Sequence, residues 1–350
     1  MTDSNNSQKE FDAFLNKIKK TYGEETLEVP SVDVITHPSL GFNILSGIQG
    51  VPLGRIMEFY GPEGGGKTTL SLLAIAAANR AGKRCFFIDI ESALDKFWAE
   101  KLGVNWELTT YIRTRLKGSE EAFEIMYDLV KSNYFSLGVV DSVASMVSAV
   151  EMDQDLVANE KQVGGFRAKM MAAGLRKLVP LLTEHNVGVI FINQVIAKPG
   201  QMYGDPEETP GGKALKFYSS VRMRVNKLTG KDAVYVENGI QIGHKCNVKI
   251  KKNKLGAPDS RTVEFDLYYD TGIDQLSEII DWLHTLKLAV KRGDYITYEE
   301  NKYTLVAFAE KIMSDQAFKD MLLTKIYTNA RGSVTGTVED ESIVLDENLE

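Results

Sequence analysis

The sequence has few cysteines and no long apolar run. Only two of its 350 residues are cysteines, Cys85 and Cys246, and both fall in strand-like runs, which indicates reduced core thiols rather than a disulfide framework. No stretch approaches the ~20 continuous apolar residues that a membrane span needs. The polar start, residues 1–10, lacks the apolar centre of a secretion signal. We therefore expect a cytoplasmic protein with no membrane partner.

Basic residues are missing from the end of the chain. None follows Arg331, whereas six acids lie from Glu339 onward. The remainder has 42 acidic and 41 basic residues, so the net charge of −7 does not argue against a nucleic-acid partner. We expect a disordered acidic tail over 333–350, which either competes with an anionic ligand for basic loops or only improves solubility.

Hydrophobic periodicity indicates an α/β architecture. From Arg55 onward, apolar strand-like runs alternate with helical runs, which is typical of a mostly parallel sheet with helices on both faces. Three later runs have period two and predict antiparallel strands that extend this sheet. Pro180 is expected to kink the last core helix or end it early. The expected strands lie at 55–60, 85–90, 136–141, 187–192, 221–225, 246–250 and 263–267, and the expected helices near 69–79, 96–102, 119–131 and 166–184.

Two smaller segments flank this core. Apolar residues at helical spacing from Phe11 to Tyr22 predict an amphipathic helix that packs either on its own body or on a neighbouring subunit. Helical spacing returns after Gly272 and, from the residues alone, indicates a small helical domain. The predicted organisation is a helix and linker over 1–38, a core over 39–272, a small domain over 273–332 and the tail over 333–350.

One glycine-rich stretch carries a specific signal. Residues 61–68 fit the pattern G-x-x-x-x-G-K-[ST] and lie between an expected buried strand and an expected helix. In that context glycines let backbone N–H groups turn toward phosphates at a helix N-terminus. Lys67 would reach the β- and γ-phosphates, and Thr68 would hold Mg²⁺. The residues expected to bind the nucleotide are Gly61, Pro62, Glu63, Gly64, Gly65, Gly66, Lys67, Thr68 and Thr69.

Three neighbouring strands end in polar side chains that suit the same nucleotide. Asp141 ends an apolar strand, as a carboxylate that binds Mg²⁺ or its water does. Glu91 follows another strand and is placed to orient or deprotonate the attacking water, a role for which Asp89 competes from inside the strand. Gln194 follows a third strand, and its amide can donate to a γ-phosphate oxygen or cap the next loop.

Two polar loops after these strands suit a polyanion. The loop from Val195 to Gly212 has eighteen residues with four glycines and three prolines, which is long for a compact domain. The segment from Asp155 to Gly165 leads into a basic helix. A single strand of nucleic acid fits such loops, although solvated loops beside a basic helix have the same composition. The residues expected to contact this polyanion, which the family resemblance given below identifies as DNA, are Lys169, Arg176, Lys198, Gly211, Gly212 and Lys213.

The chain resembles the RecA recombinase family from about Phe11 to Leu323, because its motifs follow one another in the same order as in that family. The resemblance rests on five motifs at family spacing, over residues 54–63, 87–95, 139–144, 191–194 and 211–218. It implies a RecA-type P-loop NTPase core with a small C-terminal α/β domain, using ATP and Mg²⁺. It also implies a helical filament on single-stranded DNA that pairs this strand with homologous duplex DNA. Single-strand-binding and loader proteins then become candidate partners.

The resemblance also assigns roles to individual residues. Phe217 falls at the contact between subunits, and Asp95, Trp98 and Tyr269 surround the adenine. Lys252 and Lys254 reach the γ-phosphate of the neighbouring subunit and would neutralise transition-state charge as an arginine finger does. Without the resemblance, the run 251–254 would be only a solvated strand edge. The implied catalytic set is Glu91, Lys67, Gln194, Lys252 and Lys254.

The chain departs from the family pattern at several positions. Trp98 stands where tyrosine is usual, and Lys169 replaces an arginine, which keeps the charge but loses the guanidinium fork. In the second loop, Ile196, Ala197 and Pro199 replace basic and larger apolar residues, so the departures concern DNA pairing more than ATP chemistry. We expect such divergence of a phage-encoded member acting in the host cytoplasm.

Two other functions compete with DNA-dependent ATP hydrolysis and strand exchange. A hexameric helicase can be built on the same core, although the short N-terminal segment argues against it. A DNA-binding mediator would use ATP only as a structural switch. These alternatives predict closed rings and an absence of DNA-stimulated hydrolysis, respectively.

Overall fold

The computed structural model describes residues 2–23, 27, 31–113, 119–152, 160–197, 207–230, 233–256 and 261–334. The chain divides into two compact units, residues 1–33 and 34–350. In the first unit, the helix predicted from Phe11 begins earlier, as α1 (Thr2–Tyr22). Phe11 and Phe14 on this helix are exposed. The domain boundaries expected near residues 38, 272 and 332 stay predictions.

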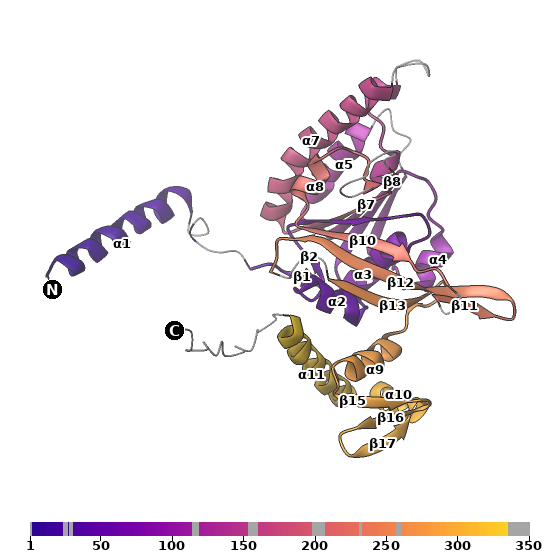
Figure 1. Cartoon of the computed structure of the whole chain (residues 1–350). Helices are drawn as coiled ribbons and strands as arrows, with labels where there is room; N and C mark the ends of the chain where they lie inside the picture. The colour runs from indigo at the N-terminus through magenta and orange to yellow at the C-terminus, as the bar shows by residue number, and fades with distance from the viewer. Residues whose placement is uncertain are drawn as a thin grey trace, which may run out of the picture. The chain divides into compact units, whose positions relative to one another are not determined.

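The second unit is organised by one ten-stranded sheet (Figure 1). Its strands are β3 (Ile56–Tyr60), β4 (Arg84–Asp89), β5 (Thr109–Arg113), β6 (Phe135–Asp141), β7 (Gly188–Asn193), β10 (Val221–Lys227), β11 (Val234–Glu237), β12 (Ile240–Asn253), β13 (Thr262–Tyr268) and β14 (Gly272–Ile273). Strands β10-β3-β7-β6-β4-β5 are parallel in that order, and β12, β13 and β14 continue the sheet antiparallel from β10, with β11 paired to β12. The predicted mostly parallel sheet with an antiparallel extension is confirmed. Two short pairs lie outside it, β1 (Val34–Ile35) with β2 (Val51–Pro52) and β8 (Ile196–Ala197) with β9 (Glu207–Glu208).

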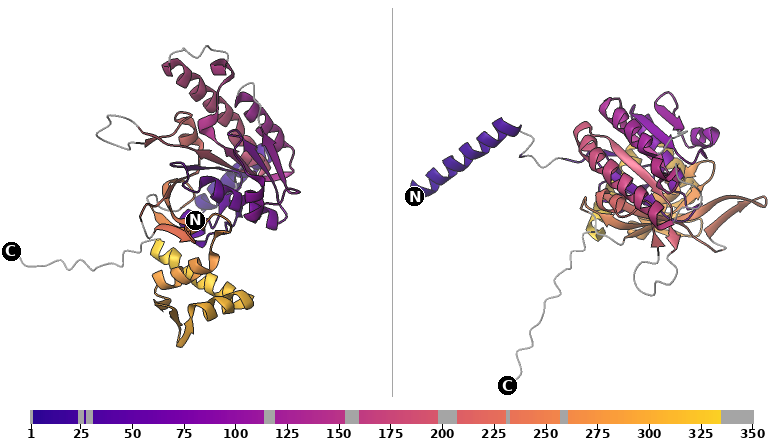
Figure 2. Two further views of the ribbon diagram at one scale, coloured as in Figure 1. Left: turned by 90° about the vertical axis from the view of Figure 1, so that its right-hand side faces the viewer. Right: turned by 90° about the horizontal axis from the view of Figure 1, so that it is seen from above.

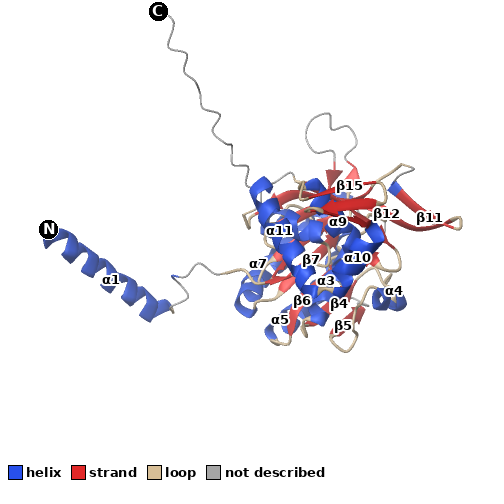
Figure 3. Ribbon diagram, turned by 90° about the horizontal axis from the view of Figure 1, so that it is seen from below, coloured by secondary structure: helices blue, strands red, loops and turns tan. Residues whose placement is uncertain are grey.

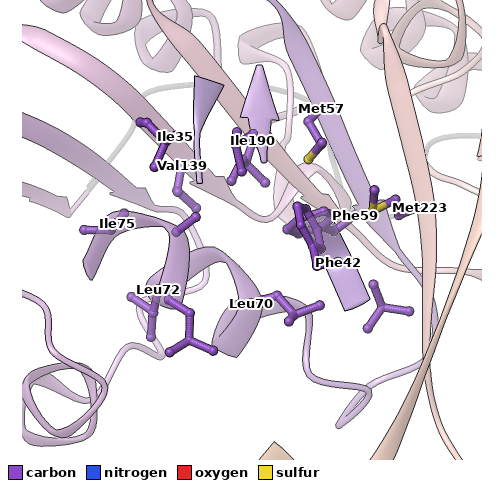
Figure 4. Packing of buried hydrophobic residues seen from close by; sticks show 14 of the residues in the cluster. Ile35, Phe42, Met57, Phe59, Leu70, Leu72, Ile75, Val139, Ile190 and Met223 are labelled. Atoms are coloured by element: carbon purple, nitrogen blue, oxygen red, sulfur yellow. The ribbon is translucent and has the colours of Figure 1, made fainter. Parts of the chain in front are cut away.

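Helices cover both faces of this sheet (Figures 2 and 3). The helices α2 (Leu40–Ser46), α3 (Lys67–Arg80) and α4 (Lys96–Lys101) contribute to one apolar core, and α5 (Ser119–Lys131) and α7 (Glu160–His185) to a second. In the first core, Leu70 and Leu72 of α3 lie near Phe59 of β3 and Ile190 of β7 (Figure 4). Parallel strands buried on both faces require apolar residues throughout, which explains the continuous apolar runs in the sequence. Shorter helices are α6 (Ala149–Met152), α8 (Ala214–Tyr218) and a 3₁₀ turn at Val143–Ser145.

The strand β10 differs from its sequence prediction in pairing and burial. It is antiparallel to β12 but parallel to β3, so it belongs to the parallel part of the sheet. Arg222, expected on a polar face, is buried because its guanidinium pairs with Glu58 and lies 4.5 Å from the centre of the Tyr60 ring. The period-two pattern predicted the strand β10, but it did not predict the ion pair between Arg222 on β10 and Glu58 on the neighbouring strand β3.

The helix α7 does not end early at Pro180 but continues to His185, so of the two predicted effects of this proline the early end is wrong and the kink stays a prediction. An interior proline costs a helix about 3 kcal/mol. Leu175, Leu178 and Leu182 on either side of Pro180 are fully buried in the second core. Burying a leucine contributes about 1.5–3 kcal/mol, so the packed face of α7 outweighs the proline.

The C-terminal elements form a third apolar core. They are α9 (Gln275–Thr285), β15 (Ala289–Arg292), β16 (Tyr295–Tyr298), β17 (Asn301–Thr304), α10 (Leu305–Ser314) and α11 (Gln316–Val334). Phe308, Leu322 and Ile326 are fully buried there. The strands form an antiparallel sheet. The C-terminal region is therefore α/β, as the family resemblance implied, whereas the small helical domain predicted from periodicity alone lacked these strands. The acidic stretch from Glu339 lies outside the described residues, and no helix within them is long and apolar enough to cross a membrane.

Candidate functional site

The phosphate-loop sequence connects the end of β3 to the start of α3. Gly66 has φ 99°, and a Cβ there would lie 2.7 Å from Leu267 Cδ2 on β13. At Gly61, a Cβ would lie 2.0 Å from the Val225 carbonyl oxygen on β10. Glycine at these two positions therefore lets the loop lie close against β10 and β13 at the helix N-terminus, where backbone N–H groups favour anions.

A cavity of about 300 Å³ lies beside this loop. Residues from the loop, from the ends of β4 and β6, and from β12 and the chain after β13 surround it. The predicted site residues that line it are Gly64, Gly65, Gly66, Lys67, Thr68, Thr69, Glu91, Trp98, Asp141 and Tyr269. Those that do not line it are Gly61, Pro62, Glu63, Asp95, Gln194, Lys252 and Lys254.

The Lys67 ammonium lies over its own loop. Its Nζ donates to the carbonyl oxygens of Gly61 at 3.0 Å and Pro62 at 2.7 Å. Burial lowers the pKa of Lys67, and the nearby carboxylates of Asp141 and Glu91 oppose that shift. A buried cation with neutral carbonyl partners at a helix N-terminus is a suitable partner for a phosphate.

Thr68 and Asp141 both line the cavity, and their side-chain oxygen atoms are hydrogen-bonded to each other. Thr68 Oγ1 donates to Asp141 Oδ2 at 2.8 Å. Burial raises the pKa of Asp141 to about 6; the Thr68 hydrogen bond opposes this shift, and Glu91 adds to it. Within the described ranges, no cluster of three or more His, Cys, Asp or Glu side chains could hold a metal ion.

The Glu91 carboxylate lies just beyond the end of β4 and receives hydrogen bonds from three side chains. Ser142 Oγ, Ser145 Oγ at 3.2 Å and Gln194 Nε2 at 3.3 Å all donate to Glu91 Oε1. Gln194 follows β7 and Ser142 follows β6, so the parallel topology brings these groups to one sheet edge. The structure thus places Gln194 beside the cavity, in contact with Glu91.

Asp89, the competing carboxylate, is held in the local fold. Its side chain accepts the backbone N–H of Ser92 at 2.7 Å and that of Leu94 at 3.0 Å, together with the Tyr111 hydroxyl at 2.9 Å. These bonds fix the loop that connects β4 to α4. Glu91 is therefore the better placed carboxylate at the cavity mouth.

Of the three residues expected around the base, Trp98 and Tyr269 line the cavity and Asp95 does not. Trp98 Nε1 donates to the Tyr269 carbonyl oxygen at 2.7 Å, which holds α4 against the chain after β13. Asp95 is the N-cap of α4 and accepts from the Trp98 backbone N–H at 2.9 Å. The three predicted residues are therefore neighbours, and Asp95 supports Trp98.

Two residues of β12 were missed by the sequence prediction. Cys246 donates its thiol to the Gly65 carbonyl oxygen at 3.3 Å, and His244 lines the cavity while being only 2% exposed. Both lie on the buried face of the strand. Extending the period-two run at 246–250 by one repeat would have reached His244. Ser142 and Ser145 were also missed, and only their position after Asp141 could have indicated them.

The two remaining lysines that were predicted to be catalytic do not line this cavity. Lys252 Nζ donates to the Lys216 and Phe217 carbonyl oxygens, and Lys254 Nζ lies 5.5 Å from the centre of the Phe217 ring. Phe217 itself is 68% exposed. The structure therefore groups Lys252, Lys254 and Phe217 together, outside the chain's own cavity.

The expected DNA contacts fall on α7 and around the start of α8. Lys169, Arg176 and Lys213 are exposed. Gly211 and Gly212 have φ of 88° and 75°, and a Cβ on Gly212 would lie 2.9 Å from Ala168 Cβ. The end of the second loop thus packs against the helix that carries the basic residues. Lys198, Pro199 and part of the first loop lie outside the described residues.

Comparison with known proteins places the chain in a family. The RecA N-terminal domain model matches residues 9–274. The chain is 41% identical to Protein RecA of Campylobacter jejuni over 304 residues, which cover 85% of this chain and 86% of that protein. It is 40% identical to Protein RecA of Azospirillum lipoferum, covering 85% and 82%, and 36% identical to that of Deinococcus radiodurans, covering 95% and 92%. The chain belongs to the RecA family.

Proposed function

We propose that this chain polymerises on single-stranded DNA and uses ATP, hydrolysed faster in the presence of DNA, to pair that strand with a homologous duplex and exchange strands. One observation carries the proposal. In a RecA-family chain, the phosphate loop, the Thr68–Asp141 pair and Glu91 converge on one cavity, and Gln194 contacts Glu91 beside it. The relatives named Protein RecA support the same activity.

The residues present fit ATP with Mg²⁺. The Thr68 and Asp141 oxygens suit a hard cation, and Lys67 holds a positive charge beside the phosphate loop. When bound, ATP supplies the phosphoanhydride bond and Mg²⁺ neutralises charge on its phosphates. We assign Thr68 and Asp141 to the cation and the loop from Gly61 to Thr69 to the phosphates, with Trp98 and Tyr269 against the adenine and Asp95 supporting them.

Glu91 is the proposed general base. Its carboxylate lies at the cavity mouth, where it orients a water molecule and takes its proton. Gln194 donates to Glu91 here, and the same amide can instead donate to a γ-phosphate oxygen. That exchange would order the loop after Gln194 and raise the affinity for DNA, as a ligand does when it binds one state better.

The DNA contacts and the subunit contact complete the proposal. Exposed basic residues on α7 and near α8 suit a phosphate backbone. Phe217 is the proposed contact with the next subunit, and Lys252 and Lys254 beside it would act on that subunit's γ-phosphate. The proposed DNA contacts are Lys169, Arg176, Lys198, Gly211, Gly212 and Lys213.

Phosphate release measured with and without single-stranded DNA is the direct test. We expect DNA to stimulate release, and the absence of stimulation would favour a mediator that uses ATP as a switch. Electron microscopy with ATP and DNA should show open helical filaments, whereas closed rings would favour a helicase. Strand exchange between a labelled duplex and a homologous single strand then measures the complete reaction.

We also propose a phage-encoded origin and a site of action in the host cytoplasm. Identities of 36–41% to the bacterial relatives named above fit a divergent member. The chain's only cysteines, Cys85 and Cys246, are both unpaired and buried, as suits a reducing compartment. Single-strand-binding and loader proteins are the proposed further partners, and pull-down on single-stranded DNA would test them.

A further inference from the structure

The 3₁₀ turn Val143–Ser145 follows the end of β6 and lies just before a fixed point of the chain. That point is Val147, which exchanges two hydrogen bonds with Ser119 at the start of α5. Ser119 N donates to the Val147 carbonyl oxygen at 2.7 Å, and Val147 N donates to Ser119 Oγ at 2.8 Å. The backbone hydrogen bonds that close the turn itself are 3.2 Å long. Because hydrogen bonds of a 3₁₀ turn have poor geometry, the position of this turn depends on the groups that pack against it.

Ser145, the last residue of this turn, connects it to the proposed base. Ser145 Oγ donates to Glu91 Oε1 at 3.2 Å, which is longer than the usual range of about 2.5–3.0 Å for O–H···O hydrogen bonds. A shift of the turn on the order of 0.3 Å would therefore break this bond or bring it into that range. Ser142 donates to the same oxygen but follows β6 directly. Ser145 is thus the donor whose position depends on the turn.

The helix α7 and the end of the second loop both support the turn. Arg167 Nη1 on α7 donates to the Ala144 carbonyl oxygen at 3.3 Å, in a partly buried contact. At the end of the second loop, a Cβ on Gly211 would lie 3.0 Å from Val143 Cγ1, so this glycine packs closely against the turn. Val143 is fully buried. The turn therefore lies between Glu91 and the two segments that carry proposed DNA contacts.

We propose that Arg167 is a positioning residue for ATP hydrolysis, because it holds the turn and thereby sets where Ser145 places the Glu91 carboxylate. The inference rests on the proposed function, in which Glu91 takes a proton from water. It adds a path from α7 to this base that does not pass through Gln194. A general base must lie within hydrogen-bond reach of the group it deprotonates, so a displaced carboxylate lowers kcat while the contacts to ATP remain.

Steady-state ATP hydrolysis by the full chain at saturating single-stranded DNA tests this inference. Arg167→Met keeps the apolar part of the side chain but loses the guanidinium. We expect kcat to fall about tenfold, with KM for ATP changed by less than about twofold. The loss is smaller than the roughly 10²–10⁴-fold expected for the base itself, because Ser142 and Gln194 still donate to Glu91.

Arg84→Met is the matched control. Arg84 Nη1 also donates to a backbone carbonyl oxygen at 3.3 Å, that of Glu107. Arg84 begins β4, at the end of the strand opposite to the cavity. The control variant therefore loses a hydrogen bond of the same kind and should keep the wild-type kcat.

Variants of Ser145 show whether Arg167 acts through the turn. Ser145→Ala should lower kcat by a similar factor, and adding Arg167→Met to it should lower kcat little further, since both changes remove one hydrogen bond to Glu91. Ser145→Thr keeps the hydroxyl and should retain most of the wild-type rate.

Three results would overturn the inference. The first is a wild-type kcat in Arg167→Met, and the second is a pair of losses that multiply in the double variant. The third is a higher DNA requirement with unchanged kcat, which would make Arg167 a DNA contact only. In each of these cases the wild type hydrolyses ATP and the proposed function stands. A wild-type chain that does not hydrolyse ATP would overturn the proposed function, and the inference with it.

Discussion

At the scale of single residues, Glu91 joins the cavity to the loop that follows Gln194. Its carboxylate oxygen receives hydrogen bonds from Ser142, Ser145 and Gln194. The two serines hold the carboxylate that we propose as the base, while the Gln194 amide can leave it for another acceptor. One side chain would thus serve both the proposed hydrolysis and the proposed response to ATP.

Replacing this base should separate hydrolysis from DNA binding. We expect Glu91→Gln to reduce kcat by about 10²–10⁴-fold, the range for loss of a general base, because an amide cannot take the proton from water. The phosphate loop is unchanged, so the variant should still bind single-stranded DNA tightly with ATP. Phosphate release and DNA anisotropy measure the two properties. Lys67→Ala is the control and should lose turnover, whereas normal turnover in Glu91→Gln would remove Glu91 from its role.

The buried pair of Arg222 and Glu58 makes a separate prediction about stability. Arg222→Met should lower the free energy of unfolding by about 3–5 kcal/mol, because it leaves the Glu58 carboxylate buried without its partner. The double variant with Glu58→Leu should recover much of this loss. Arg224→Met breaks the more exposed pair with Glu207 and should cost less, about 1 kcal/mol. Denaturant unfolding measures all three, and equal losses at Arg222 and Arg224 would contradict the argument.

Local sequence motifs predicted those site residues whose positions depend on nearby residues in the sequence. Lys67, Thr68 and Asp141 were placed from strand, loop and helix order alone, and the structure brings them together. The Arg222–Glu58 pair spans 164 positions and exists only because β10 lies beside β3. His244 belongs to a strand whose start the sequence pattern did not reveal. Such contacts follow from sheet order, which periodicity does not specify.

At the scale of elements, the Glu278 side chain links α9 to the start of α2 by hydrogen bonds. Its carboxylate accepts from Ser39 Oγ at 2.8 Å and from the backbone N–H groups of Leu40 at 2.9 Å and Gly41 at 3.1 Å. Burial raises the pKa of Glu278 to about 7, although these hydrogen bonds oppose the shift. The contact between the C-terminal elements and the core is therefore sensitive to pH.

This contact predicts a pH dependence of stability. The folded-state pKa of Glu278 is about 7 against 4.5 for the ordinary group, so the folded chain binds the extra proton between these values. The stabilisation is fully present below pH 4.5 and is lost as pH rises through about 7. We expect the denaturant midpoint of the wild type to fall between pH 5 and 8 relative to that of Glu278→Gln. Asp281→Asn, on the exposed side of α9, should keep the wild-type slope, and a parallel slope in Glu278→Gln would refute the assignment.

The sequence predicted which segments are helices and which are strands better than it predicted how the strands pair and where the elements begin and end. The strands β3, β4, β6 and β7 appear within a few residues of their predicted positions, because each is a continuous apolar run, whereas β5 was not predicted. The hairpins of β15, β16 and β17 were missed, since Tyr295–Tyr298 is short and its alternation was read with the helices around it. The path of α7 through Pro180 depends on packing on both sides, which a local rule for proline does not include.

At the scale of the whole molecule, the proposed site is complete only between two subunits. The cavity contains the phosphate loop and Glu91, whereas Lys252 and Lys254 lie beside exposed Phe217 and do not line it. A surface that binds a different surface on the next copy repeats from copy to copy, and it produces a helical filament where the rotation between copies does not close a ring. Hydrolysis would then require polymerisation, because each chain supplies the lysines for its neighbour.

Mixing two inactive variants tests this division of the site. Lys67→Ala keeps the lysines and the double variant Lys252→Ala/Lys254→Ala keeps the phosphate loop, so each alone should be inactive on single-stranded DNA. In an equal random mixture, about a quarter of the heterologous interfaces combine an intact loop with intact lysines. We therefore expect the mixture to recover about a quarter of the wild-type ATPase rate per subunit. If both variants join mixed filaments, as labelled subunits would show, and no activity returns, the lysines do not act on the neighbouring subunit.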